Sequence, residues 1–547
     1  MSNAPQDGPE AEPTRRAGRF ESTTVDAVVI GAGHNGLVTA AALADAGWEV
    51  LVLEAADTVG GAVASAELFP GYTSDLFSAF YPLSVVSPAL TAMELDRHGL
   101  RWSHAPTVIA HPAGPHDPDG AVLHREVGDT ATALGSRDGQ AWLDLFAEWQ
   151  RIKQPLLRTL FQPFPPVRGP LGLLGALGAA GALRLARFLA LPARRMGEEL
   201  FAGEPARLLI EGNAMHGDAP VDAPVSGAFG YLLAMLAQDV GYPVPVGGAG
   251  QLTQAMCRRA QSAGAQVRTG VPVEGIEVRG GRAVAVRTAT GERVAVRRAV
   301  VADVSAVSLY RRLLPADAVP QRLHRDLENF QWDTPVVKVN YALDSPIPWT
   351  ARGVRGAGTV HLGADSDGLV RWMADLQTRT LPQKPFMLFG QMTTADPTRS
   401  PEGTESAWAY THLPRGITDD ASADVLADRV DEVLQAHAPG VLDHVVARSV
   451  QRPSDLEGTD DNLGHGAVNG GTAQLYQQLV FRPVPGLGRA ETPVAGLYLG
   501  SAAAHPGGGV HGVAGLNAAK AALGEQRRLG WPRRRAVSAL QELLLRD

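Results

Sequence analysis

Short apolar runs alternate with glycine turns and an alanine-rich stretch near the start of the chain. Residues 25–30 (VDAVVI) form a valine-rich run that is typical of a buried parallel strand. Residues 37–46 (LVTAAALADA) predict a helix capped at its C-terminus by Gly47, and residues 48–53 (WEVLVL) predict a second strand. A strand, a helix and a second strand in this order indicate a parallel α/β unit.

The strand–glycine–helix pattern returns far along the chain. A glycine loop, a helix and strands follow one another in residues 242–278, and residues 291–305 add alternating apolar positions. A further strand, a glycine-rich loop and an alanine-rich helix fill residues 496–523. We therefore predict an α/β fold with one discontinuous domain beside an α+β domain. The expected segments are 23–105, 241–305 and 486–526 for the first domain, and 106–240 and 306–485 for the second.

Both ends of the chain differ from the middle in composition. Residues 1–22 are polar and rich in Pro, Gly, Glu and Asp, which predicts a disordered leader. Arg15 and Arg16 are followed by no apolar stretch, which argues against an export signal and favours a cytoplasmic protein. At the other end, residues 527–547 begin with RRLGWPRRR and predict a basic, solvent-exposed helical tail.

One segment, residues 171–192, is apolar enough to raise the question of a membrane. Its eight leucines and one phenylalanine favour insertion by roughly 3 to 5 kcal/mol, whereas each of its two arginines opposes it by roughly 2.5 to 3.5 kcal/mol. We therefore expect no membrane span. Two interpretations of the wider segment 155–200 stay open: a helix whose basic stripe contacts an anionic membrane surface, or a helical lid or core segment with solvated arginines. The stripe comprises Arg184, Arg187, Arg194 and Arg195.

Composition narrows the function classes. The net charge of −8 argues against a nucleic-acid-binding protein, because such proteins are usually basic. Cys257 is the single cysteine, which excludes a disulfide within the chain, a Cys-X-X-Cys redox pair and a cysteine-based metal cluster. We expect no metal site, and we interpret Cys257 as a core residue.

The glycine spacing of the first turn indicates a binding function. GAGHNG follows the first strand directly and spaces Gly31, Gly33 and Gly36 as G-x-G-x-x-G. The first glycine permits a tight turn, the second lets the backbone approach a pyrophosphate, and the third lets helix and strand pack closely. The helix N-terminus offers N–H groups and a positive dipole end to phosphates. Glu54, at the end of the second strand, can accept hydrogen bonds from ribose hydroxyls, so the unit predicts a dinucleotide site for NAD or FAD.

A second glycine-rich segment lies near the C-terminus. Residues 501–509 contain HPGGG and precede a helix that is expected to start at Val513. The N-terminus of that helix would favour a negatively charged or electron-rich part of a ligand. His505 and His511 belong to this segment, and histidine titrates near neutrality, so both are candidate catalytic acids or bases. In the alternative interpretation, one or both rings hold loop carbonyl groups.

These motifs together resemble those of the phytoene desaturase-related NAD(P)/FAD-dependent oxidoreductases, which include the bacterial carotenoid desaturases. The resemblance covers roughly residues 25–525 and rests on GAGHNGLVTAAALADAGWEVLVLEAADTVGG, on the GG-x-x-x-L segment at 247–252, and on LYLGSAAAHPGGGVHGVAGLNAAKAAL. It implies a discontinuous, glutathione-reductase-type FAD-binding Rossmann domain and an α+β substrate domain. The arginine that many relatives carry after the second glycine pair is absent, since Ala62, Val63 and Ala64 stand there.

The resemblance also implies the cofactor and its contacts. The second glycine pair, Gly60 and Gly61, matches an extended flavoprotein signature and selects FAD over NAD. Val273 matches a position whose backbone meets the adenine, and the C-terminal helix faces the flavin N1–C2 region, where negative charge builds on reduction. The implied FAD contacts are Gly31, Ala32, Gly33, His34, Asn35, Gly36, Glu54, Ala55, Gly60, Gly61, Ala62, Val273, Gly500, Ser501, Gly509, His511, Gly512 and Val513.

The implied activity is redox chemistry on a hydrophobic small molecule. The family desaturates, saturates or isomerises C–C bonds of terpenoid- or polyketide-like substrates, by hydride transfer to flavin N5. A flavin amine or alcohol oxidase, which an aromatic cage would favour, is the first alternative, and a non-catalytic binding module is the second. Tyr72 and Asp75 are hypothesised to approach the other side of the flavin. Trp332, Lys338 and Tyr341, on a later expected strand, are interpreted as structural.

We predict that Gly33→Glu abolishes FAD retention, because the new carboxylate would stand against the pyrophosphate. The measurement is the visible flavin absorbance of the purified variant, with circular dichroism to establish that it is folded. A folded variant with normal FAD content would contradict the assignment of this loop.

Overall fold

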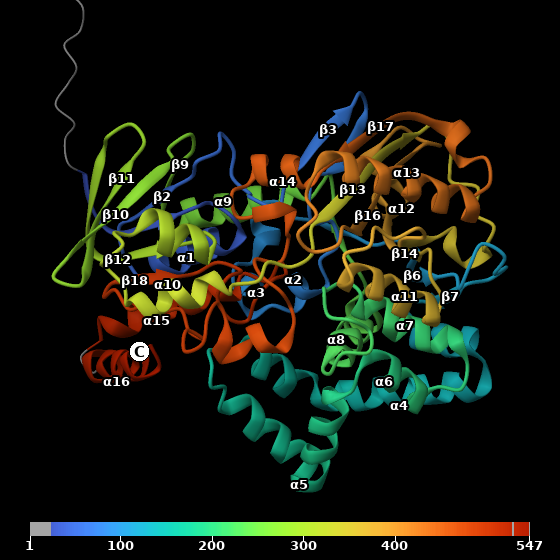
Figure 1. Cartoon of the computed structure of the whole chain (residues 1–547), viewed down its shortest axis with the longest axis horizontal. Coiled ribbons are helices and arrows are strands. Elements are labelled where there is room, and N and C mark those ends of the chain that lie inside the picture. Colours follow the sequence, from blue (N-terminus) through green and yellow to red (C-terminus); the bar gives the residue numbers. More distant parts are fainter. Residues whose placement is uncertain (1–22, 528–529, 546–547) are drawn as a thin grey trace, which may run out of the picture.

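A computed structural model describes residues 23–527 and 530–545. The expected leader, residues 1–22, lies outside the described residues. Two sheets lie side by side along the long axis of the molecule, and a group of helices projects below the second sheet (Figure 1). The fold is mixed α/β, as the sequence predicts.

The first sheet gathers strands from three distant stretches of the chain, namely β1 (Thr23–Ile30), β2 (Val50–Leu53), β9 (Gln266–Arg268), β10 (Val273–Arg279), β11 (Arg282–Thr288), β12 (Arg293–Ala302) and β18 (Leu497–Leu499). Its parallel part has the order β18-β12-β1-β2-β9. β11 pairs antiparallel with β12, and β10 pairs antiparallel with β11. β1 is buried along its last six residues because it lies between two parallel strands and beneath helices.

The second sheet is mostly antiparallel and consists of β6 (Thr107–His111), β7 (Ala121–Leu123), β13 (Val336–Leu343), β14 (Ala357–Leu362), β15 (Met387–Gln391), β16 (Glu405–His412) and β17 (Val445–Gln451). Its order is β17-β13-β16-β15-β14-β6-β7. All eight residues of β13 are buried, since this strand lies inside the sheet with side chains covered on both faces. The expected strand at residues 332–343 therefore begins four residues later than the sequence suggests.

Helices α1 (His34–Asp45), α9 (Gly250–Ser262) and α15 (Val513–Glu525) pack together on one face of the first sheet. α1 and α15 touch backbone to backbone: a Cβ atom on Gly515 would lie 2.0 Å from the Asn35 carbonyl oxygen. The Thr39 hydroxyl donates to the Gly515 carbonyl across the same contact, at 3.0 Å. Cys257 is buried on α9 and unpaired, in agreement with its interpretation as a core residue.

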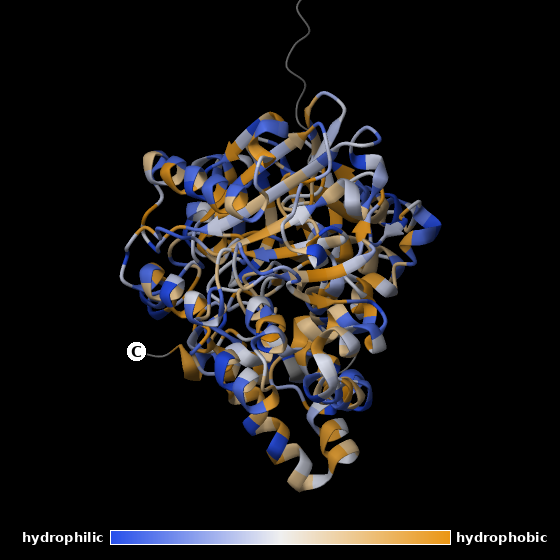
Figure 2. Ribbon diagram, turned by 90° about the vertical axis from the view of Figure 1, so that its right-hand side faces the viewer, coloured by the Kyte–Doolittle hydropathy of each residue, from blue (hydrophilic) through white to orange (hydrophobic). Residues whose placement is uncertain are grey.

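Five helices form the lower part of the molecule, α4 (Val127–Phe161), α5 (Arg168–Ala190), α6 (Ala193–Leu200), α7 (Glu204–Ala214) and α8 (Ser226–Val240). α7 and α8 pack on β6 and on each other, whereas α5 projects away from the body (Figure 2). Gly178 interrupts α5 with φ +66°, and the two halves of the helix form a V. Within the described part of the chain, α5 alone has the length and apolar composition to cross a membrane.

α5 corrects two details of the sequence interpretation. Its apolar window is not buried inside the protein, so it is not a core segment. The basic stripe is also largely neutralised, because Glu199 of α6 and Asp367 pair with three of its four arginines. The pairs are Arg187–Glu199 at 2.5 Å, Arg194–Asp367 at 2.7 Å and Arg195–Glu199 at 3.0 Å.

Shorter elements complete the chain. β3 (Ser65–Phe69) and β4 (Tyr72–Asp75) form a hairpin, and β5 (Trp102–Ser103) pairs with β8 (Val244–Pro245). α16 (Gly530–Leu544) packs on α15, so the described part of the expected basic tail is helical. The remaining helices are α2 (Pro82–Val86), α3 (Pro88–Thr91), α10 (Gln321–Glu328), α11 (Ser366–Gln377), α12 (Met392–Ala395), α13 (Asp420–His437) and α14 (Pro453–Thr459).

The α1–α15 contact predicts that the stability of the fold depends on Gly515. Gly515→Ala is expected to lower the free energy of unfolding by about 1–3 kcal/mol, because the added methyl group overlaps the Asn35 carbonyl. Gly175→Ala is the matched control: Gly175 lies in α5 with no atom within 4 Å of its Cβ position, and the change should be neutral or stabilising by up to about 1 kcal/mol. Urea unfolding of both variants measures the difference, and equal effects would contradict the contact.

Candidate functional site

Two glycine turns meet at the carboxyl end of β1 and form a narrow cradle. Gly33 and Gly60 pair as a parallel bridge, and the Gly60 N–H donates to the Ala32 carbonyl at 3.0 Å. Gly31 and Gly60 have φ values of +95° and +135°, which residues with side chains rarely adopt. A Cβ atom on Gly36 would lie 2.2 Å from the Gly31 carbonyl oxygen. The cradle therefore presents bare backbone, as the close approach of a pyrophosphate requires.

The N-terminus of α1 opens into this cradle, and no side chain caps it at Gly33. The Gly36 N–H donates to Oδ2 of Asp303 at 2.7 Å. Burial raises the pKa of Asp303 to about 8, and the nearby acidic groups Asp460 and Glu54 raise it further. The hydrogen bond from Gly36 only partly offsets this increase. At neutral pH the Asp303 carboxyl therefore keeps its proton and does not repel a phosphate.

Glu54 lies at the corner between β2 and β10. Its carboxylate accepts the N–H groups of Ala32 at 2.6 Å and Ala56 at 2.9 Å, and its remaining lone pairs can accept hydroxyl donors. Ala55, the next residue, is exposed. The loop before β10 donates an N–H to the Glu54 carbonyl at 2.8 Å, which brings Val273 to the same corner of the sheet.

The C-terminal glycine loop starts at the same edge of the sheet. The Gly500 N–H donates to the Ala302 carbonyl at 2.8 Å, and the Ser501 hydroxyl donates to the Val304 carbonyl at 2.7 Å. Arg482 is fully buried beneath the loop and holds its backbone with guanidinium N–H groups. The acceptors within 3.1 Å are the carbonyls of Asn469, Thr472 and Ala502.

His505 and His511 use ring nitrogens to hold backbone. His505 Nε2 donates to the Gln162 carbonyl at 2.9 Å, and His511 Nδ1 accepts the Val513 N–H at 3.0 Å. Burial lowers the pKa of His505 to about 4 and that of His511 to about 3, so both rings are neutral at pH 7. This geometry matches the alternative in which the rings organise the loop, and a catalytic role for either stays a prediction.

The N-termini of α1 and α15 converge on one site. Gly512, with φ +67°, precedes α15, and Oδ1 of Asn35 accepts the Gly515 N–H at 3.4 Å. The His34 ring hydrogen-bonds the backbone of Gly509, which ties the first glycine turn to the C-terminal loop. Two positive helix ends and bare backbone suit phosphates and a reduced flavin, while the buried carboxyl groups suit ribose and ribityl hydroxyls. The residues present therefore fit FAD.

Aromatic side chains gather between the second sheet and α8. Trp408 and Tyr410 stack with ring centroids 5.9 Å apart. Phe80 lies 6.0 Å from Trp408 and 6.4 Å from Tyr242, measured between centroids. Tyr242 is buried and donates its hydroxyl to Oδ1 of Asn213 at 2.7 Å. Sequence spacing did not reveal this arrangement, because the four rings come from three separate segments.

Two histidine side chains pack against these aromatic rings. The ring nitrogens Nε2 of His216 and His361 are 3.0 Å apart, and one N–H donates to the other ring. His216 also meets Tyr242 edge to face, with centroids 6.1 Å apart. Burial lowers the pKa of His216 to about 3 and that of His361 well below its usual value, so both are neutral at pH 7. We call Phe80, His216, Tyr242, His361, Trp408 and Tyr410 the aromatic–histidine cluster.

The segment after β4 connects this cluster to the glycine cradle. The Ser78 hydroxyl donates to the Ala62 carbonyl at 2.9 Å, directly after the second glycine pair. The Ser84 hydroxyl donates to the Val510 carbonyl in the C-terminal loop at 2.5 Å. Phe80 lies between these two anchors and belongs to the cluster. The cluster therefore borders the cofactor site.

Lys338 lies on β13 at the edge of the cluster, with Nζ 5.6 Å from the centre of the Trp408 ring. Its ammonium donates to the Asp75 carbonyl. Burial lowers the pKa of Lys338 to about 7; Asp75 opposes this and Arg399 reinforces it. Lys338 therefore combines a backbone contact with a pKa near neutrality, and its interpretation as structural stays a prediction.

The protein holds Asp75 through one of its two carboxylate oxygens, which also accepts the Ala249 N–H at 2.7 Å. Oδ1 of Asp75 lies 3.0 Å from Nη1 of Arg399, whose Nε donates to Asp396 at 2.8 Å, and all three side chains are buried. The Tyr72 hydroxyl donates to the Leu343 carbonyl at 3.2 Å. Tyr72 and Asp75 thus each have a partner in the protein, and their approach to the flavin stays a prediction.

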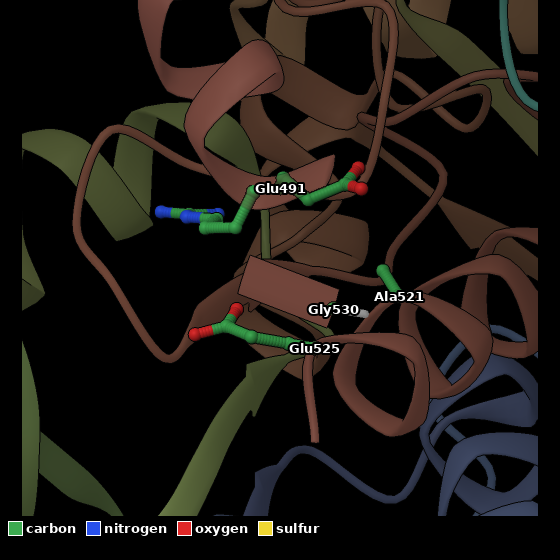
Figure 3. A pocket seen from close by; sticks show the side chains of 5 residues that line it. Glu491, Ala521, Glu525 and Gly530 are labelled. Atoms are coloured by element: carbon green, nitrogen blue, oxygen red, sulfur yellow. The ribbon is translucent and has the colours of Figure 1, made fainter. Parts of the chain in front are cut away.

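A small pocket lies at the far end of α15, away from the glycine loops (Figure 3). Glu491, Ala521, Glu525, Gly530 and Arg534 line it. Its volume of about 10 Å³ holds little more than one water molecule. The pocket is therefore separate from the cofactor site.

A donor set for FAD beside a buried, uncharged cluster of rings defines the class: the protein is an FAD-dependent oxidoreductase. Residues 36–523 match the flavin containing amine oxidoreductase family, and the chain belongs to that family. The alternative of a non-catalytic module is not retained, because the family and its relatives are oxidoreductases. The single cysteine leaves no disulfide chemistry within the chain.

Full-length relatives come from animals and bacteria. The chain is 29% identical to pyridine nucleotide-disulfide oxidoreductase domain-containing protein 2 of Rattus norvegicus, over 90% of this chain and 92% of that protein. It is 25% identical to the lycopene-forming phytoene desaturase of Pseudescherichia vulneris, over 91% and 98% respectively. In structure it resembles putrescine oxidase, with a TM-score of 0.59 and 16% identity over 92% of this chain and 99% of that one.

Asp303 predicts a pH dependence of FAD binding. As the pH rises through about 8, the carboxyl loses its proton beside the pyrophosphate cradle, and the FAD dissociation constant should rise by up to about ten-fold per pH unit. Asp303→Asn keeps an acceptor for the Gly36 N–H but cannot ionise, so its affinity should stay flat. Flavin fluorescence titrations measure both proteins, with the exposed Asp461→Asn as the control that keeps the wild-type profile. A flat wild-type profile would refute the role of Asp303.

Proposed function

We propose that this oxidoreductase desaturates a C–C bond in a hydrophobic, terpenoid- or polyketide-like substrate. The aromatic–histidine cluster carries the proposal, because it offers an apolar, uncharged surface beside the cofactor site. The full-length similarity to a phytoene desaturase supports the same substrate class.

In the proposed reaction the protein positions the substrate, excludes water from it and provides a proton acceptor. The residues of the glycine cradle would hold FAD, which would supply the hydride acceptor for one substrate carbon. The neighbouring carbon must lose a proton as the double bond forms, and the neutral amine of Lys338 is the candidate acceptor, since its pKa of about 7 leaves much of it unprotonated at neutral pH. The buried rings exclude water, which protects the reaction from competing proton transfer.

A flavin amine oxidase is the second candidate, and one observation favours it. The Trp408 and Tyr410 rings stack on each other with an interplanar angle of 26°, and an aromatic face attracts an amine cation. Against it, the histidines of the cluster are neutral, and the carboxylate of Asp75 is already paired with Arg399. A protonated amine would thus meet no unpaired anion among these groups.

The test is anaerobic reduction of the bound flavin by candidate substrates. Detergent-solubilised terpenoid hydrocarbons are expected to bleach the flavin, and primary amines and alcohols are not. Bleaching by amines alone would establish the second candidate and exclude the first.

Lys338→Met is expected to slow flavin reduction by about 100-fold while FAD content stays normal. In the wild type the rate should rise as the pH passes upward through about 7, because only the neutral amine accepts a proton, and the variant should lose this inflection. The exposed Lys384→Met is the control. An unchanged pH profile in Lys338→Met would return Lys338 to a structural role.

A further inference from the structure

A buried cation lies beneath the C-terminal glycine loop. Arg482 is enclosed by the protein, and its guanidinium nitrogens all donate to backbone carbonyl groups. The acceptors are Ala502 at 2.8 and 3.0 Å, Asn469 at 2.8 Å, Thr472 at 3.1 Å and Gly471 at 3.5 Å. Within the part of the chain that the structure describes, no carboxylate forms an ion pair with this guanidinium. Its hydrogen-bond partners are therefore neutral dipoles.

Two acidic side chains attract Arg482 from a greater distance, and both are engaged elsewhere. Asp218 is paired with Arg415 at 2.7 Å. Asp333 accepts two backbone N–H groups through one carboxylate oxygen, and burial raises its pKa to about 7, with a further contribution from the charge of Asp218. At neutral pH much of Asp333 is therefore protonated, and the charge of Arg482 is only partly compensated. An uncompensated buried charge costs free energy, so a ligand that brings negative charge is favoured here.

The guanidinium supports the C-terminal loop from behind. A Cβ atom on Gly507 would lie 3.3 Å from Cζ of Arg482, so the guanidinium and the loop backbone are in direct contact. Two residues further on, Gly509 is exposed and is one of the expected FAD contacts, and its backbone hydrogen-bonds the His34 ring. Because consecutive Cα atoms are 3.8 Å apart, the guanidinium lies within roughly 12 Å of this exposed backbone.

The charge of Arg482 acts across the loop. Burial lowers the pKa of His505 to about 4, and the positive charge of Arg482 lowers it further. Burial also lowers the pKa of His511 to about 3 and that of His34 to about 4, so the rings of the two glycine turns are neutral at pH 7. Arg482 is thus an ionised group among neutral rings, and the surrounding protein shields it from screening by salt.

We propose that Arg482 is a positioning residue that acts on the flavin through the glycine loop and favours its reduced state. A hydride carries two electrons and one proton, so its transfer from the substrate leaves the neutral flavin ring with a negative charge. The guanidinium and the N-terminus of α15 both offer positive charge at this loop, and the oxidised, neutral ring gains less from it. The inference concerns the cofactor, so it holds for a desaturase and for an amine oxidase alike.

The affinities for oxidised and for reduced FAD test this role. In Arg482→Met, the affinity for reduced FAD should fall at least about ten-fold more than the affinity for oxidised FAD. A ten-fold change in the equilibrium constant of a two-electron couple equals about 30 mV, so the reduction potential of the bound flavin should fall by at least that amount. Anaerobic titration of the holoprotein against a reference dye measures the potential, and circular dichroism establishes that the variant is folded.

Arg482→Lys separates the charge from the hydrogen bonds. Lysine keeps the positive charge but loses the planar fork, so at pH 6 the potential should stay near that of the wild type even if both oxidation states bind more weakly. Arg429→Met is the matched control. Arg429 also donates to two backbone carbonyl groups, those of Leu381 and Pro382, but it lies on α13 beside the second sheet, and its replacement should not change the potential.

Asp333 provides a second test that leaves Arg482 in place. The groups that influence its charge are Asp218, Arg482 and Tyr410, and burial raises the pKa of Tyr410. Above pH 7 the Asp333 carboxyl loses its proton, and its negative charge offsets the guanidinium. Asp333→Asn keeps an acceptor for the two N–H groups but cannot ionise. Its flavin potential should therefore exceed that of the wild type at pH 8.5 and match it at pH 6, whereas the exposed Asp443→Asn should match it at both.

A purely structural role for Arg482 has a different signature. Both variants at this position would then weaken the binding of oxidised and reduced FAD equally, and the potential would not move. That result overturns the proposal, and so does an Asp333→Asn potential equal to the wild-type value at pH 8.5. If Arg482→Met does not fold, Asp333→Asn decides, because it leaves the guanidinium and its loop contacts in place. The potentials are measured without substrate, so failure here is distinguishable from failure of the proposed desaturation.

Discussion

The rest of this structure depends on the direct contact between the backbones of α1 and α15. Gly515 leaves 2.0 Å between its Cβ position and the Asn35 carbonyl, so no side chain can separate the two helices. Their N-termini consequently open on one site, where two positive helix ends act together. Asn35 and Gly515, which meet at this contact, are 480 positions apart in sequence. The domain must therefore be discontinuous, with β12 and β18 delivered to the edge of the sheet that β1 begins.

Burial determines the protonation states of the side chains near that contact. Desolvation keeps His216 and His361 neutral and brings Lys338 close to neutrality in pKa, while Asp75 and Arg399 compensate each other. A hydride transfer needs such a dry and weakly charged setting, and a lysine has to lose its proton before it can accept one. The segment after β4 holds these groups against the cradle through Ser78 and Ser84.

The helical layer departs from the ordinary rule that apolar segments are buried. α5 exposes leucines in both arms, although the sheets and the other helices enclose three large hydrophobic clusters. An exposed apolar helix costs free energy in water, so its presence calls for a partner that covers it.

The sequence by itself determined the strand–glycine–helix units, the single buried cysteine and the type of cofactor. Glycine spacing and apolar periodicity constrain neighbouring residues, and a tight turn before a helix N-terminus needs those residues wherever the chain places them. Only the tertiary structure decided that Phe80, Tyr242 and Trp408 meet, that Asp303 joins the glycine turn, and that Asp75 turns its carboxylate to Arg399. It also decided that Lys338 titrates near neutrality and that α5 is solvent-exposed, because the pKa of a buried group and the exposure of a helix depend on distant residues that pack around them.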